Sequence, residues 1–155
     1  FAETDGGIHE VVTSSLSVPP IQYGVVELYD DGSINYHTKA VDMEGWAKRH
    51  NKRDKNLLHF NEYAAKFFES LSYDEAYRSL RGTEATPKQK NDMAKLFAQL
   101  NPAYYSGRSY TLKAPLEQDP AFALWDEFGF FSEFYDTMVN ILEDEVEDYN
   151  ELRID

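Results

Sequence analysis

The pattern of hydrophobic and polar positions changes character along the chain. Residues 21–29 and 33–38 are rich in Val, Ile and Tyr, which predicts two β-strands. Asp31-Gly32 lies between them and suits a two-residue type I′ turn, in which both central residues need φ above zero. We therefore expect an antiparallel hairpin, preceded by an extended arm over residues 1–19.

From residue 42 onward, apolar positions recur every three or four residues, which is typical of amphipathic helices. Side chains that can accept hydrogen bonds from free helix N–H groups indicate where these helices begin. The expected caps are Asp42, Asp54, Ser72, Thr86 (before Pro87) and Asp119 (before Pro120). The helix that follows Thr86 should end at about Leu100 and bury Met93, Leu96, Phe97 and Leu100. Residues 110–113 are expected to return to the sheet.

The last apolar stretch predicts a long C-terminal helix with a wide hydrophobic stripe. The stripe consists of Ala121, Leu124, Phe128, Phe131, Tyr135, Met138 and Leu142, widened by Phe130, Phe134 and Ile141. Gly129 can divide this helix in two, with Ser132 capping the second part. We interpret the stripe as core, with the seam of a homo-oligomer as the alternative.

These elements together predict an α+β fold. The arm over residues 1–19 precedes one mostly helical domain over residues 20–155. This domain has a small antiparallel sheet near its N-terminus and ends in an acidic helix within residues 116–155.

Composition agrees with one globular domain, because the chain has 155 residues, of which 42% are hydrophobic. Cysteine is absent, which excludes disulfides and thiol chemistry and fits a reducing compartment. No apolar run approaches the ~18 residues that a membrane span needs. We expect a protein of the cytoplasm, or of a viral or other large assembly. Phe1 indicates a trimmed start or proteolytic processing.

Charge is distributed in blocks. The net charge is −13, and residues 1–38 sum to −6, residues 39–115 to +5 and residues 116–155 to −12. Such blocks bear on partners and solubility rather than on fold.

The acidic block contains the strongest candidate for a binding site, with six carboxylates within residues 143–151. On a helix they would average about one charge per 2.2 Å of axis, against roughly 1.7 Å in duplex DNA. Five of them would share one helix face: Glu143, Asp144, Glu147, Asp148 and Glu151. Leu142, Val146 and Tyr149 would anchor the opposite face. Repulsion at i,i+4 and with the helix dipole opposes such a stripe.

Three interpretations of this acidic stripe stay open. It is a docking surface for a basic partner, a solvated face or frayed tail, or an intramolecular mask for the positive middle block. The middle block includes a possible basic patch, formed by Lys48, Arg49, Lys52, Arg53 and Lys55. Because cations are also favoured at a helix C-terminus, this patch is weak support for nucleic-acid binding.

Motifs for catalysis, phosphate loops or metal binding are missing from the sequence, and its four histidines lack metal-ligand spacing. We therefore predict no catalytic residue, metal or cofactor. Our leading hypothesis is a non-enzymatic acidic binding protein. It would dock its C-terminal helix into a basic, nucleic-acid-binding type of site on a partner, as a mimic, inhibitor or immunity-type protein. The alternative is a structural or assembly subunit of a virion or other large complex that self-associates through complementary charge. A third hypothesis is a weak nucleic-acid binder with an autoinhibitory tail.

Overall fold

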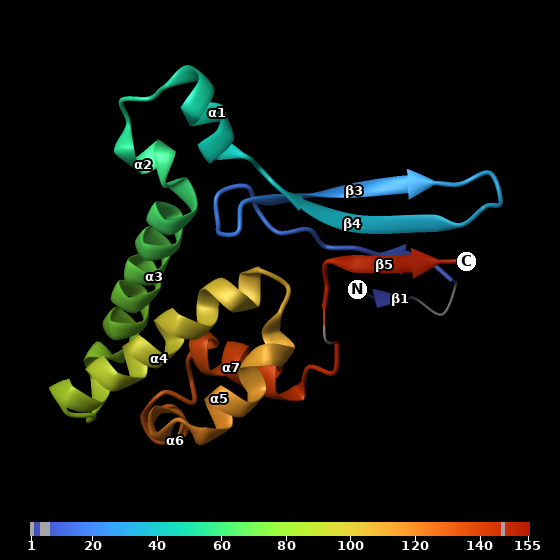
Figure 1. Cartoon of the computed structure of the whole chain (residues 1–155). Helices are drawn as coiled ribbons and strands as arrows, with labels where there is room; N and C mark the ends of the chain where they lie inside the picture. Colours follow the sequence, from blue (N-terminus) through green and yellow to red (C-terminus); the bar gives the residue numbers. More distant parts are fainter. Residues whose placement is uncertain (1, 4–6, 147) are drawn as a thin grey trace.

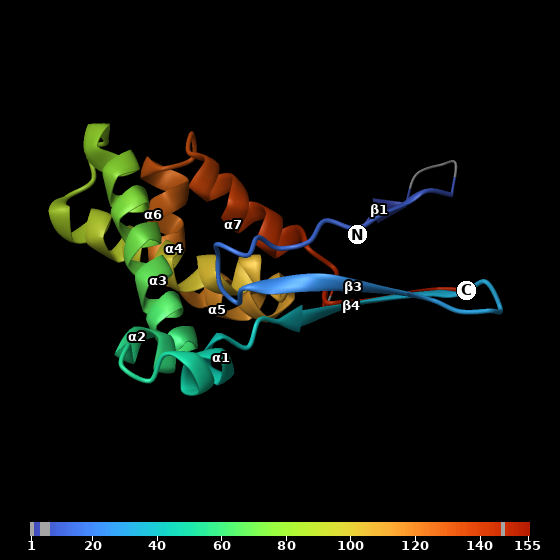
Figure 2. The same ribbon diagram turned by 90° about the horizontal axis from the view of Figure 1, so that it is seen from above.

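A computed structural model describes residues 2–3, 7–146 and 148–155 of the chain. A body of α-helices lies beside a small antiparallel sheet that extends away from it (Figures 1 and 2). The predicted α+β, mostly helical class is confirmed.

The sheet has three strands in the order β3-β4-β5, each antiparallel to its neighbour. Their bounds are β3 Gln22–Leu28, β4 Ile34–Ala40 and β5 Glu151–Ile154. Two further strands, β1 Ala2–Glu3 and β2 His9–Glu10, pair with each other in the arm. The three-stranded sheet therefore joins residues 22–40 to residues 151–154 near the end of the chain.

The β3–β4 hairpin is confirmed, but its predicted turn type is wrong. Only Gly32 of the Asp31-Gly32 pair has a positive φ, at 90°. The Tyr29 amide donates to the Ser33 carbonyl at 3.0 Å, and the Gly32 amide donates to the Tyr29 carbonyl at 3.0 Å. This is the three-residue loop in which a left-handed glycine closes the hairpin, and the Asp31 carboxylate stabilises it by accepting from the Ser33 amide at 2.9 Å.

The helices occupy most of the chain between the strands. The α-helices are α1 Met43–His50, α2 Lys55–Leu58, α3 Phe60–Ser79, α4 Pro87–Tyr105, α5 Lys113–Gln118, α6 Pro120–Phe128 and α7 Glu133–Glu143. Short 3₁₀ turns occupy η1 Leu80–Gly82 and η2 Ser109–Leu112. The predicted return of residues 110–113 to the sheet is therefore wrong.

Most predicted helix caps are confirmed. The side chains of Asp42, Asp54, Thr86 and Asp119 each accept hydrogen bonds from amides of the following turn. Ser72 is the exception, because it lies inside the continuous helix α3. Its buried hydroxyl instead accepts a hydrogen bond from the Asn101 side chain at 2.8 Å.

The core lies where α4 packs against α3, α6 and α7. As predicted, Met93, Leu96, Phe97 and Leu100 are buried. Trp125 is fully buried, and its indole N–H donates to the Met93 carbonyl at 2.9 Å. Within the predicted C-terminal stripe, Ala121, Met138 and Ile141 are core, whereas Phe130 and Phe131 are exposed.

The C-terminal segment does not form one long helix. It divides at Gly129, and the Ser132 hydroxyl accepts from the Phe134 amide at 3.3 Å, as predicted. The predicted extension of the helix through residues 144–151 is wrong, since α7 ends at Glu143 and β5 begins at Glu151. The acidic run opposes the helix dipole and repels itself, which favours ending the helix where the run begins.

Candidate functional site

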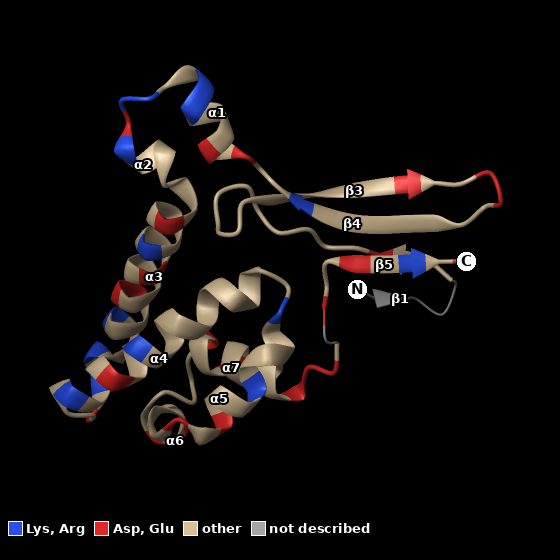
Figure 3. Cartoon of the chain, viewed as in Figure 1, with Lys and Arg blue, Asp and Glu red and all other residues tan. Residues whose placement is uncertain are grey.

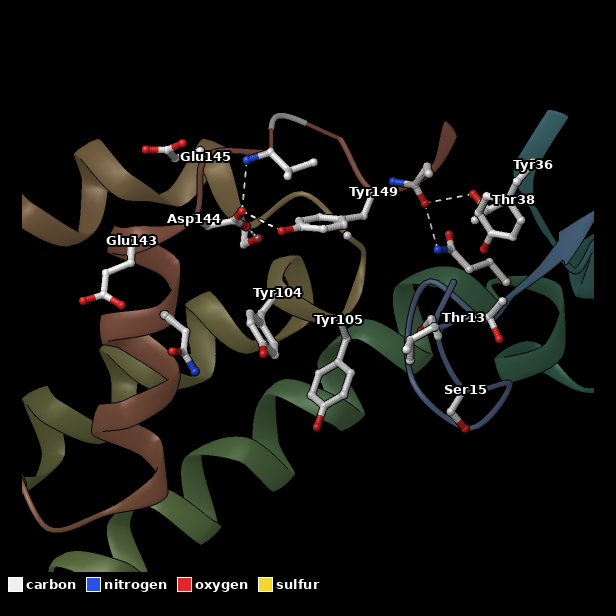
Figure 4. Close-up of a pocket in the computed structure, with 18 residues that line it drawn as sticks. Thr13, Ser15, Tyr36, Thr38, Tyr104, Tyr105, Glu143, Asp144, Glu145 and Tyr149 are labelled. Atoms are coloured by element: carbon white, nitrogen blue, oxygen red, sulfur yellow. Dashed lines mark hydrogen bonds between the residues drawn. The ribbon is translucent and has the colours of Figure 1, made fainter. Parts of the chain in front are cut away.

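An open pocket of about 970 Å³ lies among the described residues (Figure 4). It lies between the arm, one face of the sheet, the end of α4 and the segment that joins α7 to β5. Four tyrosines line it: Tyr36, Tyr104, Tyr105 and Tyr149. Carboxylates and amides of Asn140, Glu143, Asp144, Glu145 and Asn150 complete the wall.

Asn150 is the centre of a buried polar network in this pocket. Its Oδ1 accepts from Gln22 Nε2 at 2.9 Å and from Thr38 Oγ1 at 2.8 Å, and its Nδ2 donates to the Ser106 carbonyl at 3.0 Å. The Thr38 amide also donates to the Asn150 carbonyl at 3.0 Å. One side chain thereby joins β3, β4 and the end of α4.

Asp144 forms a second polar centre, immediately after α7. Its carboxylate accepts from the hydroxyls of Ser109 and Tyr149, the latter at 2.7 Å, and from the Val146 amide at 3.0 Å. Burial raises the pKa of Asp144, but these hydrogen bonds outweigh it and hold that pKa below its ordinary value. Burial, the hydrogen bond to Asp144 and its negative charge raise the pKa of Tyr149 to about 12.

The predicted acidic stripe is not assembled as a helix face. Glu143 is the last residue of α7 and Glu151 the first of β5, while Asp144 and Asp148 lie in the irregular segment between them. Glu147 lies outside the described residues.

The predicted carboxylates also differ in what they contact. Glu143, Asp148 and Glu151 are exposed, but Asp148 also accepts from the Asn150 amide at 2.8 Å. Asp144 is half-buried, and the predicted anchor Val146 is itself exposed. Among the described residues of this segment, the exposed carboxylates are thus those of Glu143, Glu145, Asp148 and Glu151.

The possible basic patch lies elsewhere. Lys48 and Arg49 end α1, Lys52 and Arg53 follow it, and Lys55 begins α2. All five side chains are exposed. Figure 3 shows α1 and α2, with their blue segments, apart from the acidic segment before β5. This separation argues against masking of the basic patch by the acidic segment within one chain.

The sequence pointed to Glu143, Asp144 and Tyr149, which line the pocket, but not to the amide side chains of Gln22 and Asn150. Asn150 and Gln22 carry no periodic or motif signal, because their roles depend on pairing between residues 128 positions apart. The one available signal was the alternation of residues 151–154, Glu-Leu-Arg-Ile, which is typical of a strand.

Among the described residues, no group of three or more His, Cys, Asp or Glu side chains is placed to hold a metal ion. No helix in the same residues combines the length and hydropathy needed to cross a membrane.

Fold and pocket together define a helical α+β domain tied to a short sheet by a buried polar network. Comparison with protein families then identifies it: residues 42–148 match the family described as the C-terminal domain of cyclic nucleotide phosphodiesterase. The chain belongs to this family. The match spans α1 to α7 and leaves the sheet outside on both sides. No curated protein matches the chain.

Proposed function

We propose that this chain is the non-catalytic accessory part of a phosphodiesterase that acts on cyclic nucleotides. Family membership over the whole helical body is the observation that carries this proposal. In this role the chain binds the catalytic domain and positions it, and the catalytic domain supplies the reacting groups.

The pocket supports an architectural role. Two of its buried polar side chains, Gln22 and Asn150, bond to each other. Asp144 bonds to Ser109 and Tyr149. Because these groups form hydrogen bonds with one another, they hold the helical body against the sheet and fix the position of one relative to the other.

The exposed carboxylates give the association its electrostatic component. Glu143, Glu145 and Glu151 lie along the segment from α7 to β5, and the salt bridges of the described residues involve none of them. A basic surface on the partner would therefore find unpaired negative charge there. Complementary charge of this kind speeds association and makes it sensitive to salt.

Two measurements test the proposal. The purified chain, assayed against cyclic AMP and cyclic GMP with Mg²⁺, Mn²⁺ or Zn²⁺, should hydrolyse neither nucleotide. It should bind a phosphodiesterase catalytic domain from the same source in calorimetry or analytical gel filtration. Hydrolysis by the chain alone, lost on removal of the metal, would show a catalytic domain and refute the accessory role. Failure to bind the catalytic domain would refute it as well.

A further inference from the structure

The charged side chains that line the pocket all carry the same sign. Among the 18 described residues of its lining, three are carboxylates, Glu143, Asp144 and Glu145, and none is Lys, Arg or His. Lys113 acts on Asp144 from outside this lining, and its ammonium lies 5.2 Å from the centre of the Tyr110 ring. A phosphate or a nucleotide would therefore meet like charge in the pocket, whereas a cation would meet opposite charge.

Two helices end at the pocket and present their negative ends to it. The last residue of α4 is Tyr105 and the last residue of α7 is Glu143, and both belong to the lining. The carbonyl end of a helix carries partial negative charge, and a cation placed there is stabilising. Neither helix has a basic residue in its last turn. The two helix ends therefore add to the attraction for a cation.

Exposed aromatic rings supply a second kind of contact for a cation. Tyr104 and Tyr105 are 36% and 43% exposed, and their rings meet edge to face with centres 5.7 Å apart. Figure 4 shows them between α7 and the arm. The face of an aromatic ring attracts a cation, and the planar guanidinium of arginine makes this contact more often than the ammonium of lysine does.

A buried hydroxyl of the arm also lacks a partner. Ser14 lines the pocket, and its Oγ is buried without a hydrogen bond among the described residues. By contrast, Gln22 and Asn150 bond to each other, and Asp144 bonds to Tyr149. A buried hydroxyl without a partner costs stability, so a ligand N–H group that reached Ser14 would gain a hydrogen bond.

We infer that this pocket binds the side chain of an arginine from a partner protein. The guanidinium lies against Tyr104 and Tyr105, and its charge is balanced by Glu143 and Glu145. Arginine suits this combination because its planar group stacks on a ring and donates hydrogen bonds to a carboxylate at the same time. A volume of about 970 Å³ also leaves room for the residues on either side of that arginine. The inference goes beyond the accessory role and does not depend on it.

The test uses a short peptide as the probe and the full chain as the receptor. The probe is Gly-Arg-Gly blocked at both ends, and its control replaces arginine with citrulline, which has a similar shape but no charge. Binding is followed by NMR through the ring signals of Tyr104 and Tyr105. We expect the arginine peptide to shift these signals saturably, to bind about 10-fold more tightly than the citrulline peptide, and to weaken as salt rises.

Two pairs of variants then locate the site. Tyr105→Leu removes a ring of the pocket, and Tyr63→Leu is its matched control, because Tyr63 is 42% exposed on α3 and outside the lining. We expect Tyr105→Leu to weaken binding about fivefold and Tyr63→Leu to stay within about twofold.

The second pair tests the carboxylates without disturbing any buried group. Glu143→Gln/Glu145→Gln neutralises two exposed acids of the pocket. Glu117→Gln/Glu127→Gln removes the same charge from exposed acids outside the lining. Both double variants should keep the wild-type Tm, and we expect only the first to weaken binding, by about fivefold or more.

Three results would overturn the inference. The first is no saturable shift of the pocket tyrosines at millimolar arginine peptide, or equal shifts by the citrulline peptide. The second is equal weakening by the pocket variants and their controls. The third is binding of spermidine or choline to these tyrosines while the arginine peptide does not bind, which would assign the pocket to a small organic cation. None of these results bears on the accessory role, because no catalytic domain is present in the assay.

Discussion

Replacing Asn150 with alanine tests whether the buried network holds the sheet to the helical body. Asn150 and Gln22 are each only 9% exposed, so the Gln22 amide would lose its partner where water has little access. Such a group costs about 1–3 kcal/mol when left unsatisfied. The Thr38 hydroxyl and the Ser106 carbonyl also lose a bond each, but both are half-buried and recover part of it from water. We therefore expect Asn150→Ala to lower the free energy of unfolding by about 2–4 kcal/mol.

Urea unfolding followed by circular dichroism measures this loss, and thermal unfolding should show a Tm lower by about 6–12 °C. Asn140→Ala is the matched control, because Asn140 lines the same pocket but is exposed on α7. That variant should stay within about 0.5 kcal/mol of wild type. Gln22→Ala combined with Asn150→Ala should be less destabilising than the sum of the two, since both remove the same bond. A loss below about 1 kcal/mol for Asn150→Ala, or strict additivity with Gln22→Ala, would refute the reasoning.

Four further predictions follow from the packing, titration and charge of named groups. Trp125→Ala removes a fully buried ring and should lower the free energy of unfolding by about 3–5 kcal/mol in urea. Because the pKa of Asp144 is lowered in the folded state, its ionised carboxylate stabilises the fold at pH values above the ordinary aspartate pKa. This contribution is lost as pH falls through the lower pKa of the folded state. Asp144→Asn should therefore be less stable than wild type by about 1–2 kcal/mol at pH 7, and urea unfolding should show this difference shrinking below about pH 4. The pKa of Tyr149 is raised to about 12. The contribution of its protonated phenol to stability is therefore fully present below the ordinary tyrosine pKa and is lost as pH rises through 12. Absorbance titration near 295 nm should show one phenol ionising that late, and Tyr149→Phe should remove it. Glu143→Gln with Glu145→Gln should keep the wild-type Tm and weaken the salt dependence of binding to the catalytic domain.

Each of these predictions has a control or an excluding result. Phe131→Ala truncates an aromatic ring that is 65% exposed and should change stability by no more than about 0.5 kcal/mol. A pH-independent difference between wild type and Asp144→Asn would contradict the lowered pKa. A wild-type titration in which all tyrosines ionise together near pH 10 would contradict the environment of Tyr149. Unchanged salt dependence after neutralising Glu143 and Glu145 would show that these carboxylates do not face a basic surface.

The parts of the fold that follow from local chemistry could be predicted from the sequence. A cap such as Asp42 or Thr86 acts on amides two or three residues away, and the α4 core follows from helical spacing. Ser72 shows the limit, because the same residue type that caps a helix also bonds across two helices. Its partner Asn101 lies 29 residues away.

The amide network of the candidate site was beyond prediction because it depends on contacts between distant segments. The predicted helix through the acidic run rested on angular spacing alone, whereas contacts with distant residues accompany the end of α7 at Glu143. Just after α7, the Asp144 carboxylate accepts hydrogen bonds from Ser109 and Tyr149. Residues 151–154 then pair with β4. The energetic penalty of an acidic helix end was visible in the sequence, but the alternative partners were not.

The pairing of β5 with β4 has a mechanical consequence. Thr38 and Asn150 are 112 residues apart yet directly bonded, so the entire helical body is looped out between two neighbouring strands. Because these strands are antiparallel, a force that separates Ile34 from Ile154 opens their ladder one pair at a time. It does not shear all the pairs together. The opening runs from that distal pair toward the Asn150 network, which is the last point to yield. As long as the ladder and the Asn150 network hold, such a force does not pass through the helical core.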